Sequence, residues 1–114
     1  MKYVSLPKLI KYPVFNSFAY GHLYLPCNPD FCGIKGTLPP LIVHVHGGPT
    51  GAAFTNLNLT IQYWTSRGFA FFDVDYRGST GYGKQYRHSL KVLIFLVNFI
   101  KTITILIIGQ LGCI

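Results

Sequence analysis

The fold is decided by the stretch LIVHVHGGP, residues 41–49. Its first six residues are apolar and mostly β-branched apart from two histidines, which predicts a buried strand over 41–46. That strand runs directly into Gly47 and Gly48, and paired glycines at a strand end indicate a backbone site that other residues would not fit. The segment therefore predicts a central strand that ends in a specialised turn.

A helix and a second strand are predicted immediately after this turn. Between residues 56 and 67, three apolar residues recur at helical spacing: Leu57, Ile61 and Trp64. The asparagines in this segment can cap the start of the helix, and Gly68 can end it in the left-handed conformation. Residues 69–75, FAFFDVD, have the composition of another buried strand. Strand, helix and strand with short connections form a βαβ unit, so we expect an α/β fold with a parallel sheet.

The flanking regions differ from this centre in composition. Residues 20–25 form a short alternating run, which predicts an edge strand within a proline-rich part of the chain. Residues 91–114 are dominated by Ile, Leu, Val and Phe and are expected to form a hydrophobic, helical tail. This change in composition sets the tail (91–114) apart from the preceding chain.

Composition excludes several functional classes. The chain has 114 residues, which fits one small domain. Its net charge of +7 comes from scattered basic residues without a nucleic-acid-binding motif, so we expect no nucleic-acid partner. The three cysteines are expected to be reduced structural thiols. The start of the chain lacks an apolar run of signal-peptide length, which favours a cytoplasmic location.

Three motifs follow one another in the central region. They are PLIVHVHGGP at 40–49, QYWTSRG at 62–68 and DVDYRGSTGYG at 73–83. Together with YGHLYLP at 20–26, they resemble the start of the catalytic domain of prolyl oligopeptidase family serine peptidases, especially the acylaminoacyl-peptidase and dipeptidyl-aminopeptidase branch. This resemblance covers residues 17–90, and it implies an N-terminal segment (1–16), a partial α/β-hydrolase domain (17–90) and a hydrophobic tail unrelated to the family (91–114). It implies a partial, truncated α/β-hydrolase fold and a serine-type hydrolase that acts on peptide or acyl-peptide substrates through a Ser, Asp and His triad.

Particular residues carry this resemblance. By position, His46, Gly47 and Gly48 correspond to the family's oxyanion loop, in which a glycine N–H is the expected donor to the developing oxyanion. Arg77 and Gly78 match the arginine-glycine turn after the next strand, where the resemblance implies a structural role. Asp75 stands where relatives usually have asparagine, so the hydrogen bonding of this loop is not inherited from the family pattern.

The catalytic triad is missing from the matching region. A nucleophile elbow needs Gly-x-Ser-x-Gly, and no serine of this chain has glycine at both −2 and +2. In the family, the nucleophile, aspartate and histidine all follow the point where the resemblance ends. We therefore expect a fragment that retains the oxyanion-loop half and is inactive alone. We also expect no cofactor and no metal site, because His44 and His46 share a strand face but no third ligand accompanies them.

Two other interpretations remain open. The tail, residues 92–114, is long enough to cross a bilayer as a helix of about 35 Å, with Lys101 near its middle. The alternative function is therefore a small non-catalytic membrane-anchored protein. Residues 78–84 also have the Gly-x4-Gly-Lys spacing of a phosphate-binding loop, but Gln85 stands where the Mg²⁺-binding hydroxyl belongs.

Overall fold

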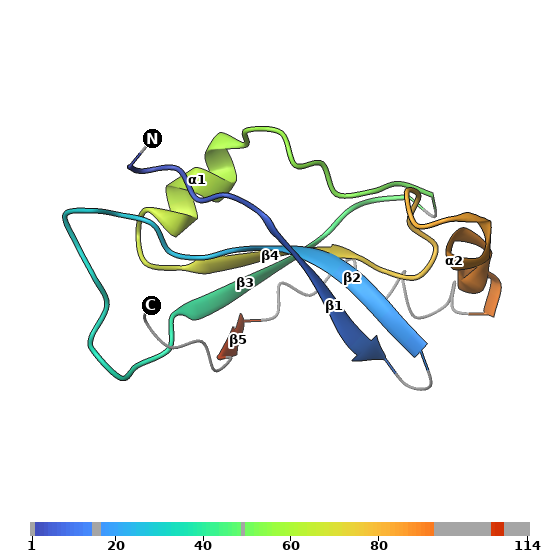
Figure 1. The fold of residues 1–114 in the computed structure, drawn as a ribbon, viewed down its shortest axis with the longest axis horizontal. Coiled ribbons are helices and arrows are strands. Elements are labelled where there is room, and N and C mark those ends of the chain that lie inside the picture. Colours follow the sequence, from blue (N-terminus) through green and yellow to red (C-terminus); the bar gives the residue numbers. More distant parts are fainter. Residues whose placement is uncertain (1, 15–16, 49, 93–105, 109–114) are drawn as a thin grey trace.

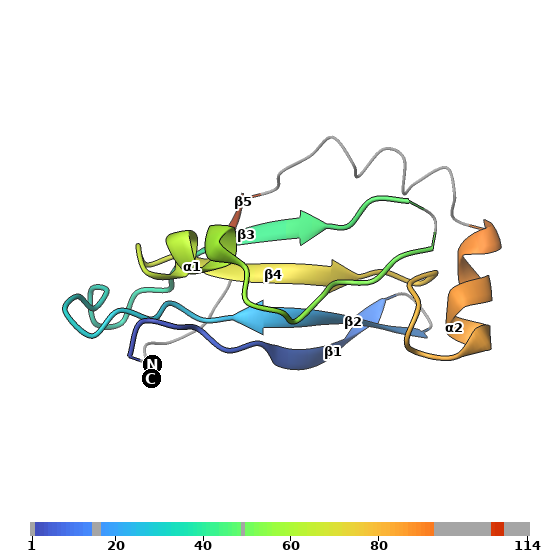
Figure 2. The same cartoon turned by 90° about the horizontal axis from the view of Figure 1, so that it is seen from above.

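A computed structural model describes residues 2–14, 17–48, 50–92 and 106–108. The described part forms a five-stranded sheet in the order β1-β2-β4-β3-β5, with helix α1 over one face (Figures 1 and 2). The elements in chain order are β1 (Lys8–Val14), β2 (Ser17–Tyr24), β3 (Pro40–Val45), α1 (Leu59–Thr65), β4 (Ala70–Asp75), α2 (Lys84–His88), the 3-10 helix η1 (Ser89–Val92) and β5 (Leu106–Ile108).

The predicted βαβ unit is confirmed by β3, α1 and β4. Strands β3 and β4 pair in parallel, from Leu41 opposite Ala70 to Val45 opposite Val74. Helix α1 connects them and contributes Ile61 to the small core. The buried residues Tyr24, Ile61 and Phe71 form one hydrophobic cluster, with Ile42 and Trp64 packed against it. The apolar runs expected to be strands therefore hold the helix against the sheet.

The sheet is mixed, so the expectation of a parallel sheet holds only for the β3–β4 pair. Strands β1 and β2 form an antiparallel pair, and β2 also runs antiparallel to β4. Only two residues separate Val14 from Ser17, and such a short connection permits antiparallel pairing alone. Residues 20–24 of the run predicted at the edge lie within β2, which has two neighbours because β1 covers its outer side.

The prediction of a helical tail is wrong at residues 106–108, the part of the tail beyond η1 that the structure describes. Residues 106–108 form strand β5, which pairs antiparallel with Pro40–Ile42 of β3. An open strand edge presents unpaired N–H and C=O groups, and a short apolar, β-branched segment can satisfy them as a strand. The rest of the expected tail helix, at 93–105 and 109–114, lies outside the described residues. Among the described helices, none is long and apolar enough to span a membrane.

Local sequence sets the two ends of α1. The side chain of Asn58 accepts hydrogen bonds from the N–H groups of Thr60 at 2.9 Å and Ile61 at 3.4 Å, which makes Asn58 the N-cap. Leu57 precedes this cap and is exposed, so it does not join the helical face on which it was predicted. Gly68 has a φ of 88°, the left-handed conformation expected beyond the end of the helix.

Replacement of the N-cap tests this account. Asn58→Ala is expected to lower the free energy of unfolding by about 1 kcal/mol, because two N–H groups of the first turn lose their acceptor. Urea denaturation followed by the fluorescence of Trp64, the single tryptophan, measures this loss. Asn56→Ala is the matched control, since Asn56 is exposed and precedes the cap. Equal losses in the two variants would contradict the capping role.

Candidate functional site

The glycine turn, which we define as residues 46–48 and 50–53, follows the carboxyl end of β3. The carboxyl end of β4 lies beside it, because the two strands are parallel neighbours, and β4 is followed by the loop 76–83. Ligands of α/β proteins bind outside the carboxyl ends of the strands. Helix α2 lies beyond this same end of the sheet (Figure 2). The predicted oxyanion-loop residues therefore stand where the topology favours a site.

His46 opens the glycine turn with an anchored ring. Its Nε2 lies 2.7 Å from the Oγ of Ser79 and 3.8 Å from Oδ1 of Asp75. The ring stacks on Tyr76 with centroids 4.4 Å apart, and the Tyr76 hydroxyl donates a hydrogen bond to the carbonyl of Gly48. The imidazole is largely buried by these contacts. His46 thus joins the turn to the end of β4 and the loop that follows it.

Asp75 is the polar centre of the site. It is 1% exposed, and its Oδ1 accepts a hydrogen bond from the N–H of Ala53 at 2.7 Å. Its Oδ2 accepts from the hydroxyl of Tyr82 at 2.6 Å and lies 3.6 Å from Nδ1 of His22. A buried carboxylate is tolerated when its oxygens are hydrogen-bonded, and both oxygens of Asp75 are.

Tyrosines close the site on the side of β2 and α2. Tyr20 stacks on Tyr82 with centroids 4.4 Å apart, and the Tyr86 hydroxyl donates to the carbonyl of Asp75 at 2.5 Å. Burial, reinforced by the hydrogen bond to Asp75 and by its charge, raises the pKa of Tyr82 far above its usual range. Burial also raises the pKa of Tyr86 to about 12. Both phenols therefore stay protonated at neutral pH and remain hydrogen-bond donors to Asp75.

Ser79, His46 and Asp75 lie together, but their arrangement differs from that of a catalytic triad. In a triad, the serine and the aspartate bind opposite nitrogens of the imidazole. Here both Ser79 and Asp75 face Nε2, while Nδ1 lies 3.2 Å from the carbonyl of Gly47. Ser79 is also 0% exposed, so no substrate carbonyl can reach its hydroxyl. The three side chains form a structural network.

The arginine-glycine turn contributes through its backbone. The N–H of Gly78 donates to the carbonyl of Tyr86 at 3.0 Å, which ties the loop to α2. None of the hydrogen bonds and ion pairs between described residues involves the guanidinium of Arg77. The structural role implied for Arg77 therefore stays a prediction.

His44 is separate from this site. Its Nδ1 lies 2.8 Å from Oδ1 of Asp73, and the ring is tilted over Phe71. The two histidines therefore have different partners, since His44 contacts Asp73 and His46 contacts Ser79. Within the described ranges, His, Cys, Asp and Glu do not gather in any group of three that could hold a metal ion.

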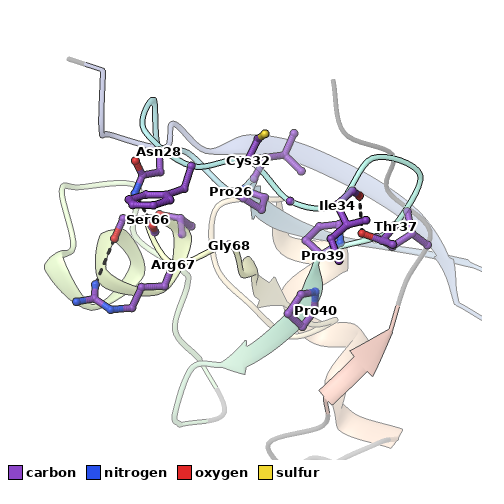
Figure 3. A pocket seen from close by; sticks show the side chains of 15 residues that line it. Pro26, Asn28, Cys32, Ile34, Thr37, Pro39, Pro40, Ser66, Arg67 and Gly68 are labelled. Atoms are coloured by element: carbon purple, nitrogen blue, oxygen red, sulfur yellow. Dashed lines mark hydrogen bonds between the residues drawn. The ribbon is translucent and has the colours of Figure 1, made fainter.

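An open hollow lies at the other end of β3, between the loop 25–40 and the end of α1 (Figure 3). Its polar side chains serve the local structure. The amide of Asn28 donates to the carbonyl of Ser66 at 2.8 Å, and the hydroxyl of Thr37 donates to the carbonyl of Ile34 at 2.6 Å. A ligand site needs polar groups that converge on its occupant, so this hollow is not a candidate active site.

Sequence reasoning found the glycine turn but missed most of what surrounds it. The sequence marks Asp75 only as a departure from the family pattern, and it does not predict that the buried Ser79 or the half-buried Tyr82 and His22 join the site. One signal in the sequence could have indicated them. Residues 75–80 are mostly polar and come at the end of a predicted buried strand, and the parallel pairing of β3 and β4 places them beside the glycine turn.

Comparison with known proteins gives a consistent result. Residues 55–94 match the model of the prolyl oligopeptidase family. The chain is 38% identical over 56 residues to the acylamino-acid-releasing enzyme of Arabidopsis thaliana, and 38% identical over 50 residues to dipeptidyl aminopeptidase BIII of Pseudoxanthomonas mexicana. These matches cover 49% and 44% of this chain, but only 7% of each relative.

Solved structures agree with the sequence matches. A puromycin-hydrolyzing peptidase of Mycobacterium tuberculosis is 43% identical, with a TM-score of 0.73. The alignment covers 78% of this chain and 14% of that chain. The small mixed sheet with its βαβ unit therefore aligns with a fraction of an α/β-hydrolase peptidase structure, and most of that structure has no counterpart here.

Proposed function

Residues 55–94 are a segment of the prolyl oligopeptidase family, and from this premise we propose that the chain supplies the oxyanion-loop part of a serine-type peptidase domain. The reaction would be hydrolysis of peptide or acyl-peptide bonds. The observation that carries the proposal is the glycine turn, which stands at the carboxyl end of β3 with His46 anchored on Ser79. As a partial α/β-hydrolase, the chain would not complete this reaction by itself.

The chemistry assigns a definite task to the turn. Attack of a serine hydroxyl on a carbonyl carbon places negative charge on the carbonyl oxygen, and backbone N–H groups aimed at that oxygen stabilise the charge. Glycine allows close approach because it has no side chain. A Cβ built at Gly47 or Gly48 meets nothing within 4 Å, so the space on the Cβ side of these two residues is open. In this proposal, a glycine N–H of the turn is the donor.

The nucleophile has to come from elsewhere. The sequence contains no Gly-x-Ser-x-Gly, and the buried Ser79 is held by His46. The family resemblance assigns serine, aspartate and histidine to segments beyond the matching region. The proposal therefore concerns a longer working chain or a complementary polypeptide, with a peptide or acyl-peptide as substrate and the cytoplasm as the expected location.

A serine-directed probe gives the first test. The 114-residue chain is expected to remain unlabelled by a fluorophosphonate, because none of its serines has the strained turn and exposed hydroxyl of a nucleophile. Intact mass spectrometry after incubation measures this. The Ser79→Ala variant is the matched control, and stoichiometric label on Ser79 that disappears in this variant would contradict the proposal.

The native protein gives the second test. An antibody raised against residues 68–83 is expected to precipitate, from the source cells, a polypeptide several times longer than this chain that takes up the fluorophosphonate. A single unlabelled band at the size of the 114-residue chain would overturn the proposal. Recovery of that band in the membrane fraction after carbonate extraction would then support the membrane-anchored alternative.

A further inference from the structure

We propose that Asp75 and Ser79 are positioning residues that hold the glycine turn in one conformation. The inference rests on the proposed function for its catalytic meaning, because the turn is taken as the oxyanion loop. It goes further by naming side chains outside the turn that fix the donors. Its physical content is a rigid glycine turn, which can be measured without any substrate.

Contacts from the end of β4 and the following loop reach the turn along its length. At its start, Nε2 of His46 lies 2.7 Å from the hydroxyl oxygen of Ser79. Further along, the carbonyl of Gly51 accepts a hydrogen bond from the N–H of Thr80 at 2.7 Å. At its end, the N–H of Ala53 donates to Oδ1 of Asp75 at 2.7 Å. The segment 75–80 therefore holds both ends of the turn.

The turn needs such support because its own sequence supplies little. Glycine loses more conformational freedom on folding than any other residue, so a glycine-rich turn is mobile unless other groups fix it. Oxyanion donors stabilise charge efficiently only when they are already oriented before the reaction. Asp75 and Ser79 are 1% and 0% exposed, so water does not compete for their contacts with the turn. Burial and geometry together assign them the positioning role.

A substitution at Asp75 can distinguish a positioning role from a dependence on its negative charge, because its two carboxylate oxygens have different partners. Oδ1 accepts from Ala53, and Oδ2 accepts from the hydroxyl of Tyr82. Asparagine keeps an oxygen for the Ala53 N–H and can turn its amide nitrogen toward the Tyr82 oxygen, so Asp75→Asn preserves the contact with the turn. Asp75→Ala removes it. A role in positioning therefore predicts rescue by asparagine, whereas a dependence on the negative charge near His22 and His46 predicts none.

The experiment measures backbone order in the full chain by NMR. In the unsubstituted protein, ¹⁵N order parameters of Gly47 and Gly48 are expected near 0.85, the value of rigid backbone. Asp75→Ala and Ser79→Ala are expected to lower both below about 0.6, while Thr65 in α1 keeps its value. In Asp75→Ala, amide exchange of Ala53 should also accelerate about 100-fold relative to Thr65. In Asp75→Asn, order and exchange should stay close to those of the unsubstituted protein.

Each outcome decides the inference. Unchanged order parameters at Gly47 and Gly48 in both alanine variants would overturn it. An equal loss of order in the glycine turn and in α1 would also overturn it, because that result indicates a general loss of stability. If Asp75→Ala does not fold, Ser79→Ala and Asp75→Asn still decide, since the first must loosen the turn and the second must not. Failure of the proposed function, seen as the absence of a labelled longer chain, would leave these order parameters unaffected, so the two failures are distinguishable.

Discussion

Gly21→Ala is expected to abolish cooperative folding of the chain or to cost about 3 kcal/mol or more, because β2 and β4 approach too closely at Gly21 for a methyl group. A Cβ at this position would lie 2.4 Å from Cζ of the Phe72 ring and 2.9 Å from the backbone oxygen of Asp73. The first distance requires the ring to move, and the second requires the strand itself to shift. Both changes fall at the centre of the sheet.

The Phe72 ring has little freedom to give way. It covers Gly21 on one side and packs edge-on against Tyr12 of β1, with centroids 5.6 Å apart. Displacement of the ring would therefore disturb the contact between β1 and β4, the two strands that flank β2. Glycine in the interior of a strand often marks such a place of close packing. The effect of one added methyl group would spread over β1, β2 and β4.

Urea denaturation followed by Trp64 fluorescence measures this effect. Gly47→Ala is the matched control, because it makes the same substitution at a glycine where a Cβ meets nothing within 4 Å. That control should change the free energy of unfolding by less than about 0.5 kcal/mol. A Gly21→Ala variant that unfolds at the same urea concentration as the control would show that the close approach of β2 and β4 is not required.

The centre of the fold was predictable because local signals agree there. The apolar run at 41–46, the asparagine cap of α1 and Gly68 all specify the same βαβ unit, and β3, α1 and β4 form it. Strand β1 was not predictable in the same way. Its residues Lys8–Val14 include Pro13 and two lysines, and they become a strand because β2 offers an antiparallel partner after a two-residue connection.

The candidate site was predictable only as far as its backbone. Paired glycines after a strand indicate a special turn whatever surrounds them, so Gly47 and Gly48 could be located from the sequence. The anchoring contacts depend on residues 22 to 33 positions apart, such as Ala53 with Asp75 and His46 with Ser79. The periodicity of apolar residues in the sequence does not predict such pairs. They arise because parallel strands bring their carboxyl ends to the same edge of the sheet.

The turn at Gly78 is the second position where one methyl group is expected to have a large effect. Gly78 has a φ of 117°, which side-chain-bearing residues rarely adopt, and a Cβ there would lie 2.6 Å from Cβ of the buried Leu90. Backbone strain of about 1–3 kcal/mol and overpacking of a similar size act together. Gly78→Ala is therefore expected to lower the free energy of unfolding by about 2–5 kcal/mol.

A matched glycine separates these two causes. Gly81 also has a positive φ, 96°, but a Cβ there meets nothing within 4 Å, so Gly81→Ala carries the backbone strain alone. The excess loss in Gly78→Ala over Gly81→Ala in urea denaturation measures the contact with Leu90. Combining Gly78→Ala with Leu90→Ala should make the two losses less than additive, because the shorter side chain vacates the space that the new methyl group needs. Equal losses at Gly78 and Gly81, or strict additivity with Leu90→Ala, would mean that the loop does not depend on this contact. The hydrogen bond from the N–H of Gly78 to Tyr86 would then be what holds the loop against α2.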